Sequence, residues 1–156
     1  LIIIDTPPED SPITWAADEA ADGILVAVSP REYDYASTTD FMLTISERFK
    51  QSPSKGENLS WFKVLAVNVA DKSPYEKIVL DKLVRTVQEL FMSANIKNSE
   101  AFKAAASRGR TVLDIKKSEE LCSPKQLDVA EESVMAVYQQ FINEIKSFSV
   151  KQGGNV

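Results

Sequence analysis

Short apolar runs alternate with longer amphipathic stretches along the chain. Three runs, at 1–4, 24–28 and 61–69, are rich in aliphatic and β-branched residues, which is typical of strands buried on both faces of a parallel sheet. Between and after them, apolar residues recur every three or four positions, which predicts helices at about 11–23, at about 36–50 and from residue 73 onward. This alternation predicts an α/β fold with an open, mostly parallel sheet flanked by helices.

The second half of the chain is expected to be mainly helical. A capping box at 73–76 begins a helix, and Gly109 closes a short helix at about 100–107. Residues 111–115 are predicted to be extended, and the polar stretch 51–60 to be an exposed loop. A last helix at about 128–148 is expected to bury Val134, Val137, Tyr138, Phe141, Ile145 and Phe148. We therefore expect one domain at 1–148 and a flexible tail at 149–156.

Composition narrows the possible chemistry. The 156 residues are 44% hydrophobic and 26% charged, as in an ordinary globular protein, and no apolar run approaches the roughly 20 residues that span a bilayer. The chain has no histidine, which excludes histidine-based triads, general bases and zinc ligands. The single cysteine, Cys122, excludes an internal disulfide and favours a cytoplasmic location. Any chemistry would rest on carboxylates, lysines, hydroxyls, backbone groups or a hard metal ion.

Charge is distributed unevenly. The chain has a net charge of -5, but residues 97–125 contain seven bases and four acids. A cluster of this kind can bind phosphates even when the whole protein is acidic. It can equally be an ordinary solvated face, and the charges alone leave both interpretations open.

Polar residues follow the predicted strands at the end where open α/β sheets bind ligands. They are Asp5 after the first run, Ser29-Pro30 after the second, and Asn68 with Asp71 after the third. A carboxylate directly after a buried strand can hold Mg²⁺ beside nucleotide phosphates. Alternatively, Asp5 caps the following turn and Asn68 bonds its own backbone.

Three blocks of sequence resemble the ParA-like partition proteins of the deviant-Walker P-loop ATPases. The segment from Leu1 to Pro8 is similar to their Walker B strand, a hydrophobic run followed by Asp-x-Pro-Pro. The block 20–30 resembles the strand that follows it. Ser99-Glu100-Ala101-Phe102, with 105–106, 109–112 and Ile115, resembles a late family segment. Order and spacing agree across roughly 1–146.

The resemblance implies a P-loop NTPase-like fold that is incomplete at the N-terminus. It implies ATP and Mg²⁺ as cofactors of an intact parent, with Asp5 at the metal and Asn68, Asp71 and Pro30 at the nucleotide. It also implies a homodimer, a ParB-like centromere-binding partner, and a cytoplasmic, nucleoid-associated protein that does not bind membranes. Non-specific DNA binding would use Lys97, Lys103, Arg108 and Arg110, although Lys97-Asn98-Ser99 replaces the Pro-Arg of many relatives.

The family's glycine-rich phosphate loop is the main departure from the resemblance. None of the five glycines precedes a Lys-Ser or Lys-Thr pair at the required spacing, so we expect the loop upstream of Leu1. The chain alone is therefore not expected to hydrolyse ATP. Three alternatives remain: a bacterial tyrosine kinase, a MinD-like regulator and a non-catalytic interaction module. A tyrosine kinase would be expected to have a tyrosine-rich tail, and a MinD-like regulator an amphipathic membrane helix at the C-terminus. The sequence shows neither feature.

Overall fold

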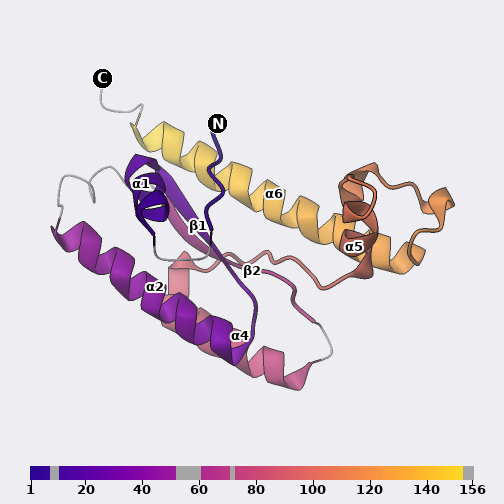
Figure 1. Ribbon diagram of the computed structural model, residues 1–156, viewed down its shortest axis with the longest axis horizontal. Coiled ribbons are helices and arrows are strands. Elements are labelled where there is room, and N and C mark those ends of the chain that lie inside the picture. The colour runs from indigo at the N-terminus through magenta and orange to yellow at the C-terminus, as the bar shows by residue number, and fades with distance from the viewer. Residues whose placement is uncertain (8–10, 52–60, 71–72, 153–156) are drawn as a thin grey trace.

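The computed structural model describes residues 1–7, 11–51, 61–70 and 73–152 (Figure 1). Within these residues, five helices flank a small parallel sheet, so the predicted α/β class is confirmed. The principal elements are α1 (Pro12–Ala20), β1 (Gly23–Val28), α2 (Glu32–Gln51), β2 (Trp61–Ala66), α4 (Pro74–Val87), α5 (Glu100–Ala106) and α6 (Pro124–Gln152). Three short 3-10 turns complete the described part: η1 (Gln88–Leu90), η2 (Val112–Asp114) and η3 (Lys117–Glu119).

The sheet is built from β1 and β2, which run parallel in register from Gly23 opposite Trp61 to Val28 opposite Ala66. A third segment, residues 91–98, runs less regularly beside β2 and the residues that follow it. It forms two isolated parallel bridges, Phe91 with Val64 in β2 and Lys97 with Val69 beyond β2. Side chains alternate between the two faces of a strand. Phe62 and Val64 therefore point to one face, and Trp61 and Lys63 point to the other.

Each face of the sheet has its own helical cover. Helices α2 and α4 lie on one side and α6 lies on the other (Figure 1). The α2/α4 side contains the first hydrophobic cluster, which we call the sheet core: Val28, Val64, Leu83 and Val87. A second cluster, which we call the helical core, lies where α5 and η2 pack on the first half of α6: Ala101, Ala105, Val112, Ile115, Leu127 and Ala130.

Two helix starts follow the capping chemistry expected from the sequence. The Ser11 hydroxyl accepts a hydrogen bond from the Thr14 N–H at 3.3 Å, and Pro12 occupies the first helical turn of α1. The Ser73 hydroxyl does the same for the Glu76 N–H at 3.2 Å. The Glu76 carboxylate reaches back to the Ala70 N–H at 2.9 Å. The predicted start of α4 is therefore confirmed.

The predicted strand at residues 1–4 is wrong. Residues 1–7 have no regular secondary structure, and the side chains of Leu1 and Ile2 are each 88% exposed. A strand exists only where another backbone pairs with it, and within the described residues β1 pairs with β2 alone. The apolar composition of the run could not supply that partner.

Smaller differences have local causes. Helix α2 begins at Glu32, four residues before the expected start. The segment expected to be extended at 111–115 contains η2, because the Asp114 carboxylate accepts hydrogen bonds from the Thr111 hydroxyl and N–H. Helix α6 spans 124–152 and therefore includes part of the expected tail, and its Tyr138 is 55% exposed although it was expected to be buried. The loop expected at 51–60, apart from residue 51, and the side chain of Phe148 lie outside the described part.

Candidate functional site

The carboxyl edge of the sheet brings two of the predicted nucleotide residues to neighbouring strand ends. Because β1 and β2 are parallel and in register, Pro30 and Asn68 follow their strands on the same edge. Pro30 is fully buried, whereas Asn68 is half-buried and has a φ of 57°. Asparagine tolerates this left-handed conformation better than most residues. Asp71, the third predicted nucleotide residue, lies outside the described part.

The backbone beside Asn68 is held on both sides. The Val67 N–H donates to the Val28 carbonyl at 2.9 Å. The Val69 N–H donates to the Ile96 carbonyl at 3.0 Å, and the Val69 carbonyl accepts from the Asn98 N–H at 2.9 Å. Asn68 therefore stands at a fixed bend between β1 and the 91–98 segment, with a carboxamide that can both donate and accept hydrogen bonds.

The predicted metal ligand, Asp5, is in a different situation. It is exposed and lies in the irregular segment 1–7, so the strand that was expected to orient it is not formed. In the described part of the chain, no group of three or more acidic or cysteine side chains could hold a metal ion. Mg²⁺ at a nucleotide site needs only one or two protein carboxylates when phosphates supply further oxygens. Asp5 therefore suits Mg²⁺ in its donor chemistry but lacks a structural element that positions it.

The four predicted DNA-binding residues lie on or beside α5 and differ in how they are held. Arg108 is exposed, and Lys103 is exposed while bonding Glu100 at 2.9 Å. Lys97 is half-buried at the bridge to Val69. Arg110 is less available than expected, because its guanidinium binds both oxygens of Glu119 at 2.6 and 3.2 Å.

Ion pairs and hydrogen bonds within the basic segment, and from it to α6, occupy several of its charged groups. The Lys116 backbone N–H, and then the Arg110 guanidinium, lower the pKa of Glu119 below its ordinary 4.5. The Thr111 hydroxyl and N–H lower the pKa of Asp114 below 3.8. The hydrogen bond to Asp128 on α6 raises the pKa of Lys117 above 10.5. Part of the positive charge counted in the sequence is thus neutralised within the fold.

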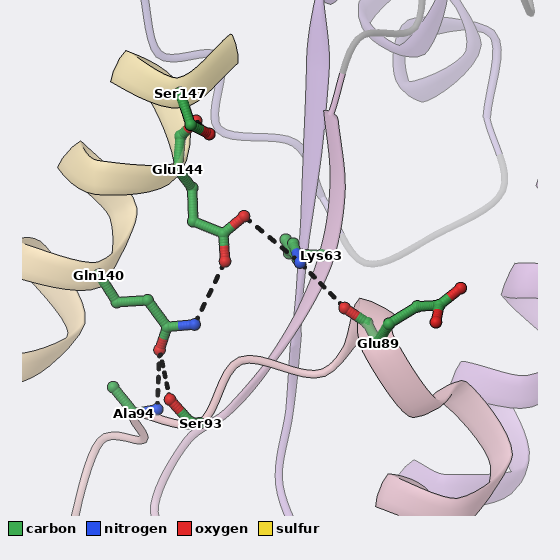
Figure 2. A network of polar contacts seen from close by, with 7 residues as sticks. All are labelled: Lys63, Glu89, Ser93, Ala94, Gln140, Glu144 and Ser147. Carbon is green, nitrogen blue, oxygen red and sulfur yellow. Dashed lines mark hydrogen bonds and ion pairs between the residues drawn. The ribbon is translucent and has the colours of Figure 1, made fainter.

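A polar network between β2 and α6 was not foreseen from the sequence (Figure 2). The Lys63 ammonium lies 3.3 Å from a Glu144 carboxylate oxygen and donates to the Glu89 carbonyl at 2.9 Å. The other Glu144 oxygen accepts from the Gln140 amide at 3.3 Å. The signal that could have revealed this network is a lysine inside an otherwise apolar strand, facing polar residues four apart on a helix.

Gln140 also accepts hydrogen bonds from an irregular part of the 91–98 segment. Met92 and Ile96 donate to the Val64 and Ala66 carbonyls, each at 2.9 Å, so this segment advances four residues while β2 advances two. The extra residues form a bulge, which leaves ladder groups unpaired. The Gln140 side-chain oxygen accepts from the Ala94 N–H at 2.9 Å and from the Ser93 hydroxyl at 3.1 Å (Figure 2).

A groove of about 680 Å³ lies beside this network. Its lining residues are small or polar, with one carboxylate among them: Ser93, Ala94, Ala136, Gln139, Gln140, Asn143, Glu144 and Ser147. It has none of the sequence-predicted site residues. The predicted residues are divided among the sheet edge, the N-terminal segment and α5.

Comparison with known proteins gives no further assignment. No family model matches the chain, and no curated protein matches it. Among the described helices, none is both long enough and apolar enough to cross a membrane.

Proposed function

We propose that this chain is the C-terminal portion of a ParA-like P-loop ATPase for plasmid or chromosome partitioning. The parent would bind ATP and Mg²⁺, form a homodimer, bind DNA without sequence preference and respond to a ParB-like partner at the nucleoid. The observation that carries the proposal is the β1–α2–β2 unit, whose parallel strands end at Pro30 and at a bent Asn68. This edge is where doubly wound α/β proteins bind nucleotides.

The nucleotide part of the proposal rests on Asn68. Its carboxamide offers one acceptor and two donors, which complements the donor and acceptor on the edge of an adenine ring. Neighbouring backbone bonds hold the bend, so little ordering would be required on binding. Asp71 and Pro30 would complete the surroundings of the base, and Asp5 would hold Mg²⁺ once a phosphate loop brings the nucleotide to it.

The DNA part of the proposal rests on α5 and its flanks. Lys103 and Arg108 are the exposed members of the predicted set, and non-specific binding requires only that cations reach phosphates. The Arg110–Glu119 pair supports this surface by fixing the turn after α5. We therefore place DNA contact mainly on Lys103 and Arg108, with Lys97 beside them and Arg110 in a supporting position.

The decisive test begins with the coding sequence upstream of Leu1, which should encode a glycine-rich loop ending in Gly-Lys-Thr or Gly-Lys-Ser. Without such a loop the ATPase proposal fails. With it, the intact protein should bind ATP, and Asn68→Ala should weaken binding about tenfold or more, because one to two hydrogen bonds to the base are removed. Asn143→Ala, an exposed asparagine on α6, is the matched control and should leave affinity unchanged.

DNA binding is tested separately by salt titration of the intact protein with ATP. Arg108→Glu should weaken binding and lower the slope of log affinity against log salt by about 0.9 for each phosphate that the protein no longer neutralises. Arg85→Glu, the same charge change on an exposed part of α4, should alter neither quantity. Equal effects of the two substitutions would refute the α5 surface. Arg110→Glu is a poor probe, because it also breaks the pair with Glu119.

A further inference from the structure

Helix α6 is attached in two chemically different ways along its length. Its first half belongs to the helical core, where Leu127 is 1% exposed and Ala130 is fully buried. After Ser133, none of the described side chains of α6, up to residue 147, is fully buried. This second half, residues 136–147, which we call the arm, lies along the face of the sheet opposite α2 and α4 (Figure 1).

Both polar and apolar contacts hold the arm in place. Gln140 binds the 93–94 bulge through its oxygen and binds Glu144 through its nitrogen, and Glu144 pairs with Lys63 (Figure 2). On the apolar side, Phe141 packs edge-to-face on Trp61 with ring centroids 5.3 Å apart, and Val137, Ile142 and Ile145 are half-buried. Each polar contact depends on the next, because Glu144 is shared between Gln140 and Lys63.

This attachment differs energetically from that of the first half. The Lys63 and Glu144 side chains keep only 19% and 24% of their exposure, so docking the arm removes much of their hydration. The attraction between such charges is largely offset by the desolvation that it requires. When the arm lifts, water replaces each broken hydrogen bond and the apolar side chains that are uncovered are only half-buried ones. Separating the helical core would instead expose fully buried apolar surface.

We propose that the arm is a releasable strap, which docks on β2 through the Lys63–Glu144–Gln140 network and lifts while residues 124–133 stay packed on α5. Lifting exposes Trp61 and Lys63 and removes the Gln140 side chain from the 93–94 bulge. The bulge continues directly into the bridge between Lys97 and Val69, so the state of the strap is communicated to the sheet edge at Asn68. The strap is thus a conformational switch built into the fold.

The experiment measures the position of the strap in the full chain. Spin labels are placed at Lys146 on the strap and at Lys77 on α4, both exposed, in a Cys122→Ser background. The labelled protein without further substitutions should give one dominant distance between the two spin labels. Lys63→Glu places two carboxylates together and should shift the distribution to a broad, longer distance, raising the lifted population about fivefold, as expected for the loss of a partly hydrated ion pair. Lys63→Glu with Glu144→Lys should restore the dominant distance.

Two comparisons separate a strap from general destabilisation. Lys82→Glu breaks the Lys82–Glu32 pair (3.4 Å) between α4 and α2, far from the strap, and should not change the distance. Hydrogen exchange of residues 124–133 should stay within about twofold in every variant, because the helical core remains intact. If Lys63→Glu alone does not fold, Glu144→Gln removes the same pair without adding a like charge and carries the same expectations. An unchanged distance, or faster exchange throughout 124–133, would overturn the proposal.

Discussion

Leu127 on α6 offers the most direct test of how the protein holds together. Its side chain is 1% exposed and lies in the helical core with Ala101, Ala105, Val112 and Ile115. Two of these four neighbours are alanines, so the leucine supplies much of the apolar volume between α5 and α6. Leu127→Ala should therefore destabilise the protein substantially.

The magnitude follows from burial. Truncating a fully buried leucine to alanine costs about 2–5 kcal/mol, because the favourable transfer of the removed methyl groups out of water is lost and a cavity remains. Neighbouring alanines can move little to fill the space, so we expect about 3–4 kcal/mol. Domains are stable by only about 5–15 kcal/mol, so this single change would consume a large share of the total. Leu83→Ala in the sheet core, at 2% exposure, should cost a similar amount.

Urea unfolding followed by far-UV circular dichroism measures both changes. Leu113→Ala is the matched control, since Leu113 belongs to η2 yet is 51% exposed, and it should cost less than about 0.5 kcal/mol. If the two cores unfold together, Leu127→Ala and Leu83→Ala lower one midpoint with an unchanged slope; if they unfold separately, each lowers its own transition. A loss below about 1 kcal/mol for Leu127→Ala would refute the packing argument itself.

Three further substitutions or conditions test local features. Gly23→Ala should cost about 1–3 kcal/mol in the same unfolding assay, because the added methyl would lie 3.0 Å from the Trp61 ring and 3.2 Å from its carbonyl oxygen; a stabilised variant would contradict the close approach. Ser99→Ala should cost about 1–2 kcal/mol, since the hydroxyl caps α5 and donates to the Gln126 carbonyl at 2.7 Å; a neutral effect would show that the cap is dispensable. Because the pKa of Glu119 is lowered on folding, the unfolded chain binds its proton more tightly, so this stabilisation is present above pH 4.5 and disappears as pH falls through the folded pKa. In Glu119→Gln, the thermal unfolding midpoint should fall less steeply as the pH is lowered below 4.5. A dependence on pH identical to that of the unsubstituted protein would contradict this contribution of Glu119.

The class of fold and several element starts could be predicted from the sequence because local chemistry determines them. Ser11 and Ser73 cap their helices whatever the rest of the chain does, and the apolar runs that became β1 and β2 had a partner in each other. The run at 1–4 has equally suitable composition but pairs with nothing in the described part. Pairing is a property of two segments, so a pattern in one of them could not determine it.

The candidate site was harder to anticipate for a related reason. Sequence position gave the strand-end residues Pro30 and Asn68, because parallel register brings such ends together. It could not show that Glu119, nine residues away, would engage Arg110, or that Lys63 and Glu144 would meet across 81 positions. Such contacts arise from tertiary packing, and a count of charges along the chain carries no information about which charges will meet.

The N-terminal segment is where the structure differs most from the prediction made from the sequence. Leu1–Ile4 was expected to be a buried strand, yet Ile2 and Ile3 are 88% and 79% exposed. Because both side chains are exposed, Ile2→Asp with Ile3→Asp should change the unfolding free energy by less than about 0.5 kcal/mol and reduce binding of a dye that reports apolar surface. Val28→Ala, at 2% exposure in β1, is the buried comparison and should cost about 2 kcal/mol. A loss above about 2 kcal/mol for the aspartate pair would mean that the segment is buried in solution, as the resemblance to a Walker B strand implies, because charges are not tolerated in a strand covered on both faces.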